Sequence, residues 1–431
     1  MIVALDVSLK MVIVLEALPA FVWRTVMLGI TEDSLASIAF HLNWTKNNVK
    51  HTDIVYAHRV NFWRDFFPED LRRNFIGSFI GDTVSHHYQP GDLVPLPDSK
   101  QNVTLPHCNI EGQRPDGTPI VPHYGRFYPR GILRGVPGIF RGNIEPFRCV
   151  DANDDGIRAD LNHPLAGQEL HLDAHVLDVR EKFEEHGGTA NDWVEQALTG
   201  PGMQSRYNGA PTRFFEGPAF ERDDSRDDRS FYDRPRLVQH IDDRAIRTIS
   251  DLYGRLIPPG SRVLDLMSSW TSHLPDSLET ISVTGLGMNA EELVANTRLT
   301  GYDVHDLNRR PQLPYPDAAF DAIICTVSVE YLVKPFAVFA EVGRVLAPDG
   351  IFVVTFSDRW FPTKAIRLWK ELHPFERMGM VLELFRQYDR FHALETFSSQ
   401  GWPRPEGDKY ADRMAFSDPV FGVWGRRRPD A

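Results

Sequence analysis

Cysteine is scarce in this chain, and its apolar runs are short. The three cysteines among 431 residues, Cys108, Cys149 and Cys325, lie far apart and form no CxxC pair. That spacing indicates neither a disulfide framework nor a zinc site, and it favours a reducing, cytoplasmic setting. The first thirty residues are rich in apolar side chains, but charged residues interrupt them before the roughly 18 uncharged positions that a membrane-spanning helix needs. We therefore expect a buried helix or a mis-set start codon there, and no membrane anchor.

An excess of positive charge is also absent. The 47 Lys and Arg residues face 59 Asp and Glu residues, which leaves a formal net charge of −12 at pH 7. This balance weakly repels nucleic acids and anionic membrane surfaces, so we expect neither as a partner. With 42% hydrophobic residues the chain is typical of a globular protein, and its length favours two or three domains.

The first half of the chain is predicted to be rich in β-structure. The stretch 68–75 has a helical pattern, and a turn after it leads into a strand at 83–88. Residues 95–146 are dense in proline and glycine, which indicates an irregular or β-rich segment with many turns.

A longer strand is expected over 169–180, where apolar residues alternate with His171, Asp173 and His175. One face of this strand should be buried and the other hydrated. The three polar residues would share the hydrated face, where weak metal binding is conceivable but a solvated surface is commoner. The acidic run 151–156 matches half of a calcium-binding loop, but it lacks the closing glutamate and is read as a hairpin turn. We therefore expect no metal site.

The second half alternates buried strands with helices, which predicts a parallel sheet in a doubly wound α/β domain. A helix is expected around 236–256 and helical runs at 290–299 and 334–346, with strands at 262–266, 283–286, 322–327 and 351–356. Ligands of such sheets bind beyond the carboxyl ends of the strands, so the residues that follow each strand carry the function.

The second half contains two ordered motifs, LPYPDAAFD at 313–321 and EVGRVLAPDG at 341–350. They resemble the LPF-x-D-x-x-FD segment and the E-x-x-RVL-x-PGG turn of the class I S-adenosylmethionine-dependent methyltransferases. The resemblance covers about 236–400 and implies a Rossmann-like fold with S-adenosyl-L-methionine as the cofactor. It also places Asp306 at the adenine amino group and Leu307 beside the ring.

The cofactor loop departs from the pattern of that family. After Asp265 the family usually has glycines, which let the backbone approach the cofactor, whereas this chain has bulkier residues through Thr271. Where the family commonly has an acid for the ribose, this chain has Gly287, followed by Asn289. Two interpretations stay open: polar side chains replace the lost contacts, or the loop is a closed remnant. On the first, the cofactor site comprises Asp265, Ser268, Ser269, Trp270, Gly287, Asn289, Asp306, Leu307 and Ser328.

Three residues are candidates for the methyl-acceptor side of the site. His273 is a possible general base because its pKa lies near neutrality, or else a histidine that bonds to backbone. Glu330 and Tyr331 follow a strand and are expected to face the acceptor, although Tyr331 could instead pack under the cofactor. The polar and aromatic run 357–364 either closes over the substrate, with Arg359 or Lys364 meeting an anion, or is a solvated loop.

The run DLNHPLAG at 160–167, with the strand after it, resembles the end of the insert domain in SlyD-type FKBP peptidyl-prolyl isomerases. A looser likeness begins near residue 60 and ends near 182. It implies a β-rich FKBP-like domain whose pocket would be lined by aromatic residues, for which the candidates are Phe62, Trp63, Phe66, Phe67, Phe75 and Phe79. A peptide- or substrate-binding module is the role we favour for this domain.

The predicted order of domains is an uncertain amino-terminal extension (1–45), an FKBP/SlyD-like domain (46–182), a linker (183–235), a methyltransferase-like domain (236–400) and a carboxy-terminal tail (401–431). The function we expect is methyl transfer to an unknown acceptor, either a small molecule or a protein, with the FKBP-like domain recognising the substrate. The alternatives are a prolyl isomerase with a degenerate methyltransferase domain and an interaction scaffold.

Overall fold

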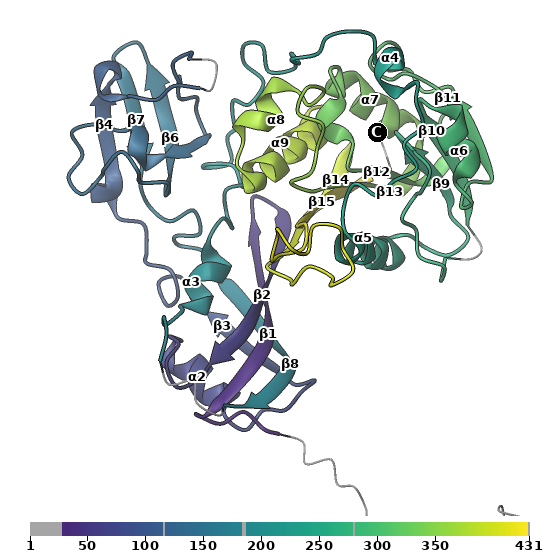
Figure 1. Ribbon diagram of the computed structural model, residues 1–431. Coiled ribbons are helices and arrows are strands. Elements are labelled where there is room, and N and C mark those ends of the chain that lie inside the picture. The colour runs from purple at the N-terminus through teal and green to yellow at the C-terminus, as the bar shows by residue number, and fades with distance from the viewer. Residues whose placement is uncertain (1–27, 115–116, 183–186, 279–280, 430–431) are drawn as a thin grey trace, which may run out of the picture.

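The computed structural model describes residues 28–114, 117–182, 187–278 and 281–429. The helix expected within the first thirty residues lies almost wholly outside these ranges. Among the helices of the described ranges, none combines the length and the apolar character that crossing a membrane requires. The protein has two lobes joined by one large sheet, with a small separate sheet beside the first lobe (Figure 1).

The large sheet has eleven strands in the order β11-β10-β9-β12-β13-β15-β14-β2-β1-β8-β3. The first five are parallel, and β15 runs antiparallel to both of its neighbours. The seven strands of the carboxy-terminal lobe are β9 (Arg262–Leu266), β10 (Ser282–Gly287), β11 (Gly301–Val304), β12 (Phe320–Thr326), β13 (Leu346–Phe356), β14 (Phe391–Gln400) and β15 (Val420–Arg427).

Helices cover both faces of this lobe, because its central strands are apolar on both sides. Helix α5 (Asp243–Leu256) packs on one face, against a core that includes Val263. Helices α7 (Pro335–Val345) and α9 (Pro374–Arg386) cover the other face, against a core that includes Leu264. Consecutive residues of β9 thus face opposite layers, and the predicted doubly wound domain is confirmed. Two shorter helices complete the lobe, α6 (Ala290–Ala295) and α8 (Arg367–Glu371).

The amino-terminal lobe is an antiparallel half-barrel packed on short helices. Its strands are β1 (Ser34–Lys46), β2 (Val49–Asn61), β3 (Thr83–Tyr88) and β8 (Leu170–Glu181), and its helices are α2 (Glu69–Phe75) and α3 (Trp193–Leu198). The predicted order of helix, turn and strand over 68–88 is confirmed, as is the alternation in β8, where Leu172 is buried and His171 exposed. Together these elements enclose a core of their own.

A second sheet is inserted between β3 and β8. Its strand order is β4-β7-β6-β5, formed by β4 (Asn102–Pro106), β5 (Phe127–Pro129), β6 (Pro146–Asn153) and β7 (Gly156–Asp160). Single helical turns lie at η1 (Ser99–Gln101), η2 (His107–Asn109) and η3 (Arg130–Ile132). The acidic run 151–156 forms the tight turn between β6 and β7, as predicted. The NHPLAG segment then returns the chain to the large sheet.

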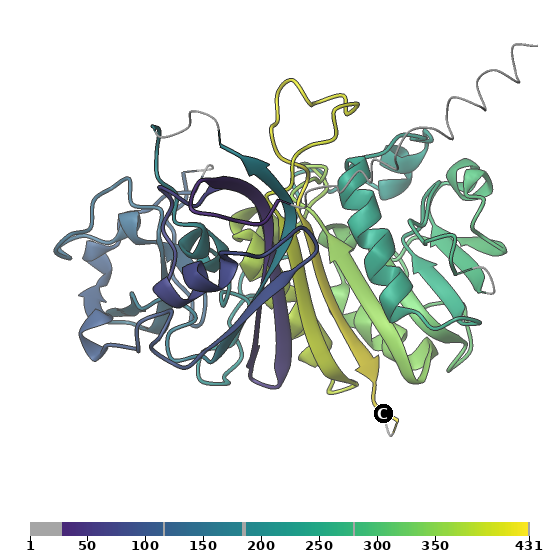
Figure 2. The ribbon, with the colours of Figure 1, turned by 90° about the horizontal axis from the view of Figure 1, so that it is seen from below.

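The two lobes share the large sheet because β14 pairs in parallel with β2. A row of buried polar contacts follows this junction. His51 Nδ1 lies 2.7 Å from the Thr396 hydroxyl oxygen, and the Ser398 hydroxyl donates to the Asp53 carboxylate. Figure 2 shows the strands of both lobes continuing side by side through the junction. The lobes are therefore joined by backbone pairing rather than by a flexible connection.

The structure differs from the predicted boundaries in three places. Strand β1 begins at Ser34, inside the predicted extension. The sequence did not indicate this strand because its first seven residues are all buried, so buried and exposed positions do not alternate there. Strand β15 lies in the predicted tail, yet it fills the gap between β13 and β14. Helix α5 begins at Asp243 rather than near 236, since the Asp242 carboxylate accepts from the Arg244 and Ala245 amides and caps the helix there.

Candidate active site

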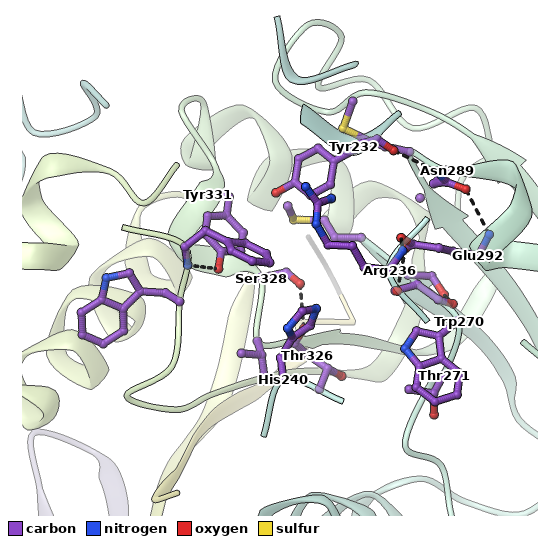
Figure 3. Close-up of a pocket in the computed structure, with 18 of the residues that line it drawn as sticks. Tyr232, Arg236, His240, Trp270, Thr271, Asn289, Glu292, Thr326, Ser328 and Tyr331 are labelled. Carbon is purple, nitrogen blue, oxygen red and sulfur yellow. Dashed lines mark hydrogen bonds between the residues drawn. The ribbon is translucent and has the colours of Figure 1, made fainter. Parts of the chain in front are cut away.

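A cavity of 570 Å³ opens at the carboxyl ends of the parallel strands. Its walls come from the segments that follow β9, β10, β11, β12 and β13, as the sheet topology requires. All nine residues predicted for the cofactor site line this cavity, together with His273 and Tyr331. Figure 3 shows the side chains from these segments converging on one space.

The glycine-poor loop after β9 keeps a sharp turn. Met267 has φ +61°, a left-handed conformation in which glycine is the usual residue. The Asp265 carboxylate accepts from Ser268 Oγ at 2.6 Å and from Ser272 Oγ at 2.7 Å, which ties the two ends of the turn together. Burial raises the pKa of Asp265 to about 6, and the two hydroxyls oppose that rise. These bonds fix the turn, and the residues of the bulkier loop line the cavity.

Gly287 is required where this loop meets β10. The Ser268 amide donates to the Leu286 carbonyl at 2.8 Å, and a Cβ atom on Gly287 would lie 2.2 Å from the Ser268 carbonyl oxygen. Only glycine allows this approach. The position that carries an acid in many relatives therefore cannot carry one here.

A carboxylate that the sequence reasoning missed lies five residues further on. Glu292, in the first turn of α6, lines the cavity, and its carboxylate accepts from Ser269 Oγ at 2.7 Å and from the Arg236 amide at 2.7 Å. The Asn289 side chain, by contrast, is already hydrogen-bonded within the protein. Its amide group donates to the carbonyls of Tyr232 and Asp233, and its side-chain oxygen caps α6. The one feature of the sequence that could have indicated Glu292 is that acidic residues occupy the first turn of this helix. Acidic residues at that position also stabilise a helix without any role in binding.

Asp306 and Leu307 line the cavity in the segment that follows β11. One Asp306 carboxylate oxygen accepts from the backbone amides of Asn308 and Arg309, at 2.9 and 3.1 Å, which fixes the side chain at the cavity wall. Leu307 is buried among the core residues beside it. An anchored carboxylate next to an apolar surface suits a purine ring that carries an amino group.

The acceptor side is only partly as predicted. Tyr331 lines the cavity, but its hydroxyl accepts from the Phe361 amide at 2.9 Å and also interacts with Glu330, so the ring forms wall and the hydroxyl is engaged. Glu330 was expected to face the acceptor. It instead lies behind the wall, 1% exposed, because the turn η4 (Val329–Tyr331) directs it into the core. Burial raises its pKa to about 8.

His273 lines the cavity with φ +53°. Burial lowers its pKa to about 4, so its imidazole is uncharged at pH 7 and is a weak base. His240 is a second candidate, which the sequence reasoning did not single out. It lines the cavity, its ring packs edge-on at 5.2 Å from the ring of Phe361, and burial lowers its pKa below the usual value.

The end of the predicted linker and the residues that follow it cover one side of the cavity. Residues 222–240, here called the strap, include helix α4 (Asp228–Tyr232) and carry cavity-lining residues along much of their length. The strap is held by side-chain contacts with the sheet loops: Asn289 binds two strap carbonyls, and Trp270 Nε1 donates to the Val238 carbonyl at 3.2 Å. It is not a free linker, because these contacts anchor its backbone.

Asp228 fixes the middle of the strap. Its carboxylate receives Lys364 Nζ at 3.0 Å, Arg222 Nη1 at 2.9 Å and Asn308 Nδ2 at 2.9 Å. Lys364 was predicted to meet an anionic substrate, but its side chain is fully buried in this cluster and does not line the cavity. Arg359, the other candidate, does line it.

Comparison with known families agrees with this geometry. Residues 268–354 match the methyltransferase-domain family. This range holds most of the loop after β9, the ends of β10, β11 and β12, and both motifs, so this part of the carboxy-terminal lobe is a methyltransferase domain. Its matched part begins inside the glycine-poor loop.

The amino-terminal lobe has a different relative. The FKBP-type 16 kDa peptidyl-prolyl cis-trans isomerase of Escherichia coli (strain K12) is 28% identical to this chain over 120 residues, which are 27% of this chain and 69% of that protein. The same comparison finds the corresponding protein of Shigella flexneri. The β-rich FKBP-like domain expected from the sequence is thus confirmed as a homologous part of the chain.

Solved structures of the methyltransferase class align with the chain over less than half its length. An S-adenosylmethionine-dependent methyltransferase from Aquifex aeolicus is 17% identical, with 46% of this chain and 96% of that one covered and a TM-score of 0.30. One from Mesorhizobium loti is 16% identical, with 41% and 96% covered and a TM-score of 0.28. The assignment here rests on the strand order, the motifs and the family match.

Proposed function

We propose that this protein transfers a methyl group from S-adenosylmethionine to an acceptor bound in the cavity. The observation that carries the proposal is the position of the cavity: it lies at the carboxyl ends of β9, β10 and β12, and more than half of its lining residues fall within the range 268–354 that matches methyltransferase domains. Its volume of 570 Å³ suits a ligand of the cofactor's size with room for a small group beside it.

The residues present fit this cofactor in spite of the missing glycines. Asp306 offers a carboxylate for the adenine amino group, and Leu307 an apolar surface for the ring. Glu292 can accept from ribose hydroxyls, because a carboxylate has about four acceptor positions and two are used here. The left-handed Met267 keeps the loop in a turn without glycine. When bound, the cofactor supplies a methyl group carried on a positively charged sulfur.

The chain's own residues would position the reactants and exclude water. The strap covers the cavity and keeps bulk water from the reacting atoms. His240, whose pKa burial lowers, would take the proton that an acceptor hydroxyl or amine loses. Holding the two reactants in line accounts for most of the rate in such a displacement.

We further propose that the FKBP-like lobe binds a polypeptide. Support comes from apolar side chains exposed at one end of its sheet, where β2 ends and β3 begins; these are Trp63, Phe66, Phe79 and Ile80. Exposed aromatic residues of this kind are typical of interaction sites. In a prolyl-peptide binding assay with the full chain, Phe66→Ala should weaken binding several-fold. Equal binding by the variant would contradict this role.

Calorimetry with S-adenosylhomocysteine, the product form of the cofactor, tests the main proposal. We expect saturable binding of one molecule per chain. Absence of binding at millimolar ligand would contradict methyl transfer and favour a prolyl isomerase or a scaffold.

A further inference from the structure

Arg236 occupies an unusual position in the strap. Its guanidinium carbon lies 4.5 Å from the ring centre of Phe231, 5.5 Å from that of Phe361 and 5.8 Å from that of Tyr232. Nη2 donates to the Phe231 carbonyl at 2.8 Å. The rings and this bond hold the planar group in one orientation at the cavity wall.

One side of this guanidinium has no partner. Nη1 is shielded from solvent and makes no hydrogen bond to any residue that the structure describes. No described carboxylate lies within salt-bridge distance of the group. A buried N–H of this kind costs about 1 to 3 kcal/mol when it stays unpaired, so a ligand that supplies an acceptor removes a penalty already present in the free protein.

Three of the five acidic residues that line the cavity are already engaged by other protein groups. Asp265 is bound by two serines, Glu292 by Ser269 and a backbone amide, and Asp228 by Lys364 and its other partners. Arg359 also lines the cavity, with its guanidinium 5.1 Å from the ring centre of Tyr410 and no carboxylate within salt-bridge distance in the described ranges. Asp306 and Asp358 line the cavity as well, and Asp306 is assigned to the cofactor. Arg236 and Arg359 are thus the cationic side chains of the described wall that are left for an anionic ligand.

The walls near Arg236 are aromatic. Tyr232, Tyr331 and Phe361 line this part of the cavity, and in Figure 3 the side chains of Arg236, Tyr232, Ser328 and Tyr331 surround the same space. Flat rings favour a planar ligand, and the strap above leaves room for a small molecule rather than a folded chain.

We propose that the methyl acceptor is a small planar molecule with an anionic group, a carboxylate or a phosphate, which Arg236 binds. This inference rests on the proposed methyl transfer, since it names the second ligand of the same cavity. Arg236 is then a specificity-determining residue, and Arg359 adds to the positive field at the cavity wall.

The test uses two probes that differ in charge and little in shape, benzoate and benzamide. Each is titrated calorimetrically into the full-length protein saturated with S-adenosylhomocysteine, and into the protein alone. We expect benzoate to bind at least about ten-fold more tightly than benzamide, with an affinity that falls as salt is raised. Equal affinity for the two probes, or no binding of benzoate in either state, would overturn the proposal. Phenyl phosphate distinguishes the two anionic groups by its affinity relative to benzoate.

Substitutions test whether Arg236 is the residue that binds benzoate. Arg236→Gln should weaken benzoate binding about ten-fold or more, while Arg236→Lys keeps part of the affinity. Arg234→Gln is the matched control, because Arg234 is exposed on the same strap and does not line the cavity. If both glutamine variants bind benzoate like the wild type, the proposal fails.

The cofactor measurement separates this inference from the proposed function. If Arg236→Gln weakens S-adenosylhomocysteine as much as benzoate, the arginine serves the cofactor and the acceptor proposal is overturned. If the wild type binds benzoate but no S-adenosylhomocysteine, methyl transfer fails while the anion site stands. Should Arg236→Gln not fold, the salt dependence and the preference for benzoate in the wild type still decide the question.

Discussion

Lys364 and Asp228, 136 positions apart in the chain, form a fully buried ion pair with 3.0 Å between Nζ and Oδ1. The pair joins the strap to the segment that follows β13. Because the strap covers the cavity, this contact links the closure of the site to the stability of the lobe.

Removal of the lysine should loosen the strap. In Lys364→Met the Asp228 carboxylate loses one of its buried cationic partners, which costs about 3 kcal/mol in the free energy of unfolding. Chemical denaturation of the full chain measures this loss, and hydrogen exchange should show faster opening of the strap amides. Lys370→Met is the control, since the partly exposed Lys370 pairs with the exposed Asp223 and should cost at most about 1 kcal/mol. Equal effects of the two substitutions would contradict the anchoring role.

Glu292 is expected to carry the ribose contact that Gly287 cannot. Glu292→Gln keeps the shape of the side chain but loses charge and acceptor capacity, so it should weaken S-adenosylhomocysteine binding about ten-fold. Its neighbour Glu291 is exposed, and Glu291→Gln should leave the affinity unchanged. Calorimetric dissociation constants for the two variants decide this point, and indistinguishable values would remove Glu292 from the site.

Asp306 should recognise the adenine amino group. In Asp306→Asn one oxygen can still accept from the Asn308 and Arg309 amides, so the turn is retained, while the other position becomes a donor. The variant should bind S-adenosylhomocysteine more weakly and should lose its preference over S-inosylhomocysteine, which has a carbonyl in place of the amino group. A preference like that of the wild type would mean that the ring lies elsewhere.

The junction between the lobes predicts a dependence of stability on pH. Burial raises the pKa of Asp53 from 3.8 to about 7, and the hydrogen bond from Ser398 opposes this rise. Between these two values the folded chain binds the proton more tightly than the unfolded chain, so the contribution of Asp53 to stability falls as the pH rises from about 4 to 7.

Asp53→Asn should remove this dependence. At pH 8 the variant should exceed the wild type in free energy of unfolding by up to about 4 kcal/mol, and near pH 4 the difference should vanish. Denaturation curves between pH 4 and 8 measure this, with Asp251→Asn on the exposed face of α5 as control. A constant difference across this range would contradict a protonated Asp53 at the junction.

The sequence motifs identified the methyltransferase lobe because their contacts need particular residue types. Arg344 of the second motif binds Glu341 and Asp317 and the carbonyls of Leu313 and Tyr315, all within the two motifs. Such a cluster leaves a strong pattern in the sequence. Strand β8 could also be predicted from the sequence. One of its faces is buried and the other hydrated, so apolar and polar residues alternate along it.

The local sequence pattern did not predict that the strap packs against the lobe. Its charge run reads as a solvated linker, and several of its charges do pair locally, as Asp224 does with Arg226 and Asp227 with Arg229. Only the fold brings Lys364 to Asp228. Glu330 was misplaced for a related reason, because a single helical turn decides whether a residue after a strand faces the cavity or the core.

Whether the glycine-poor loop binds the cofactor is the question on which the account depends. Calorimetric titration of the full-length protein with S-adenosylhomocysteine answers it most directly. We predict one saturable site per chain, with an affinity that falls in Glu292→Gln and stays unchanged in Glu291→Gln. Absence of binding at millimolar ligand, with the chain shown to be folded, would contradict the account.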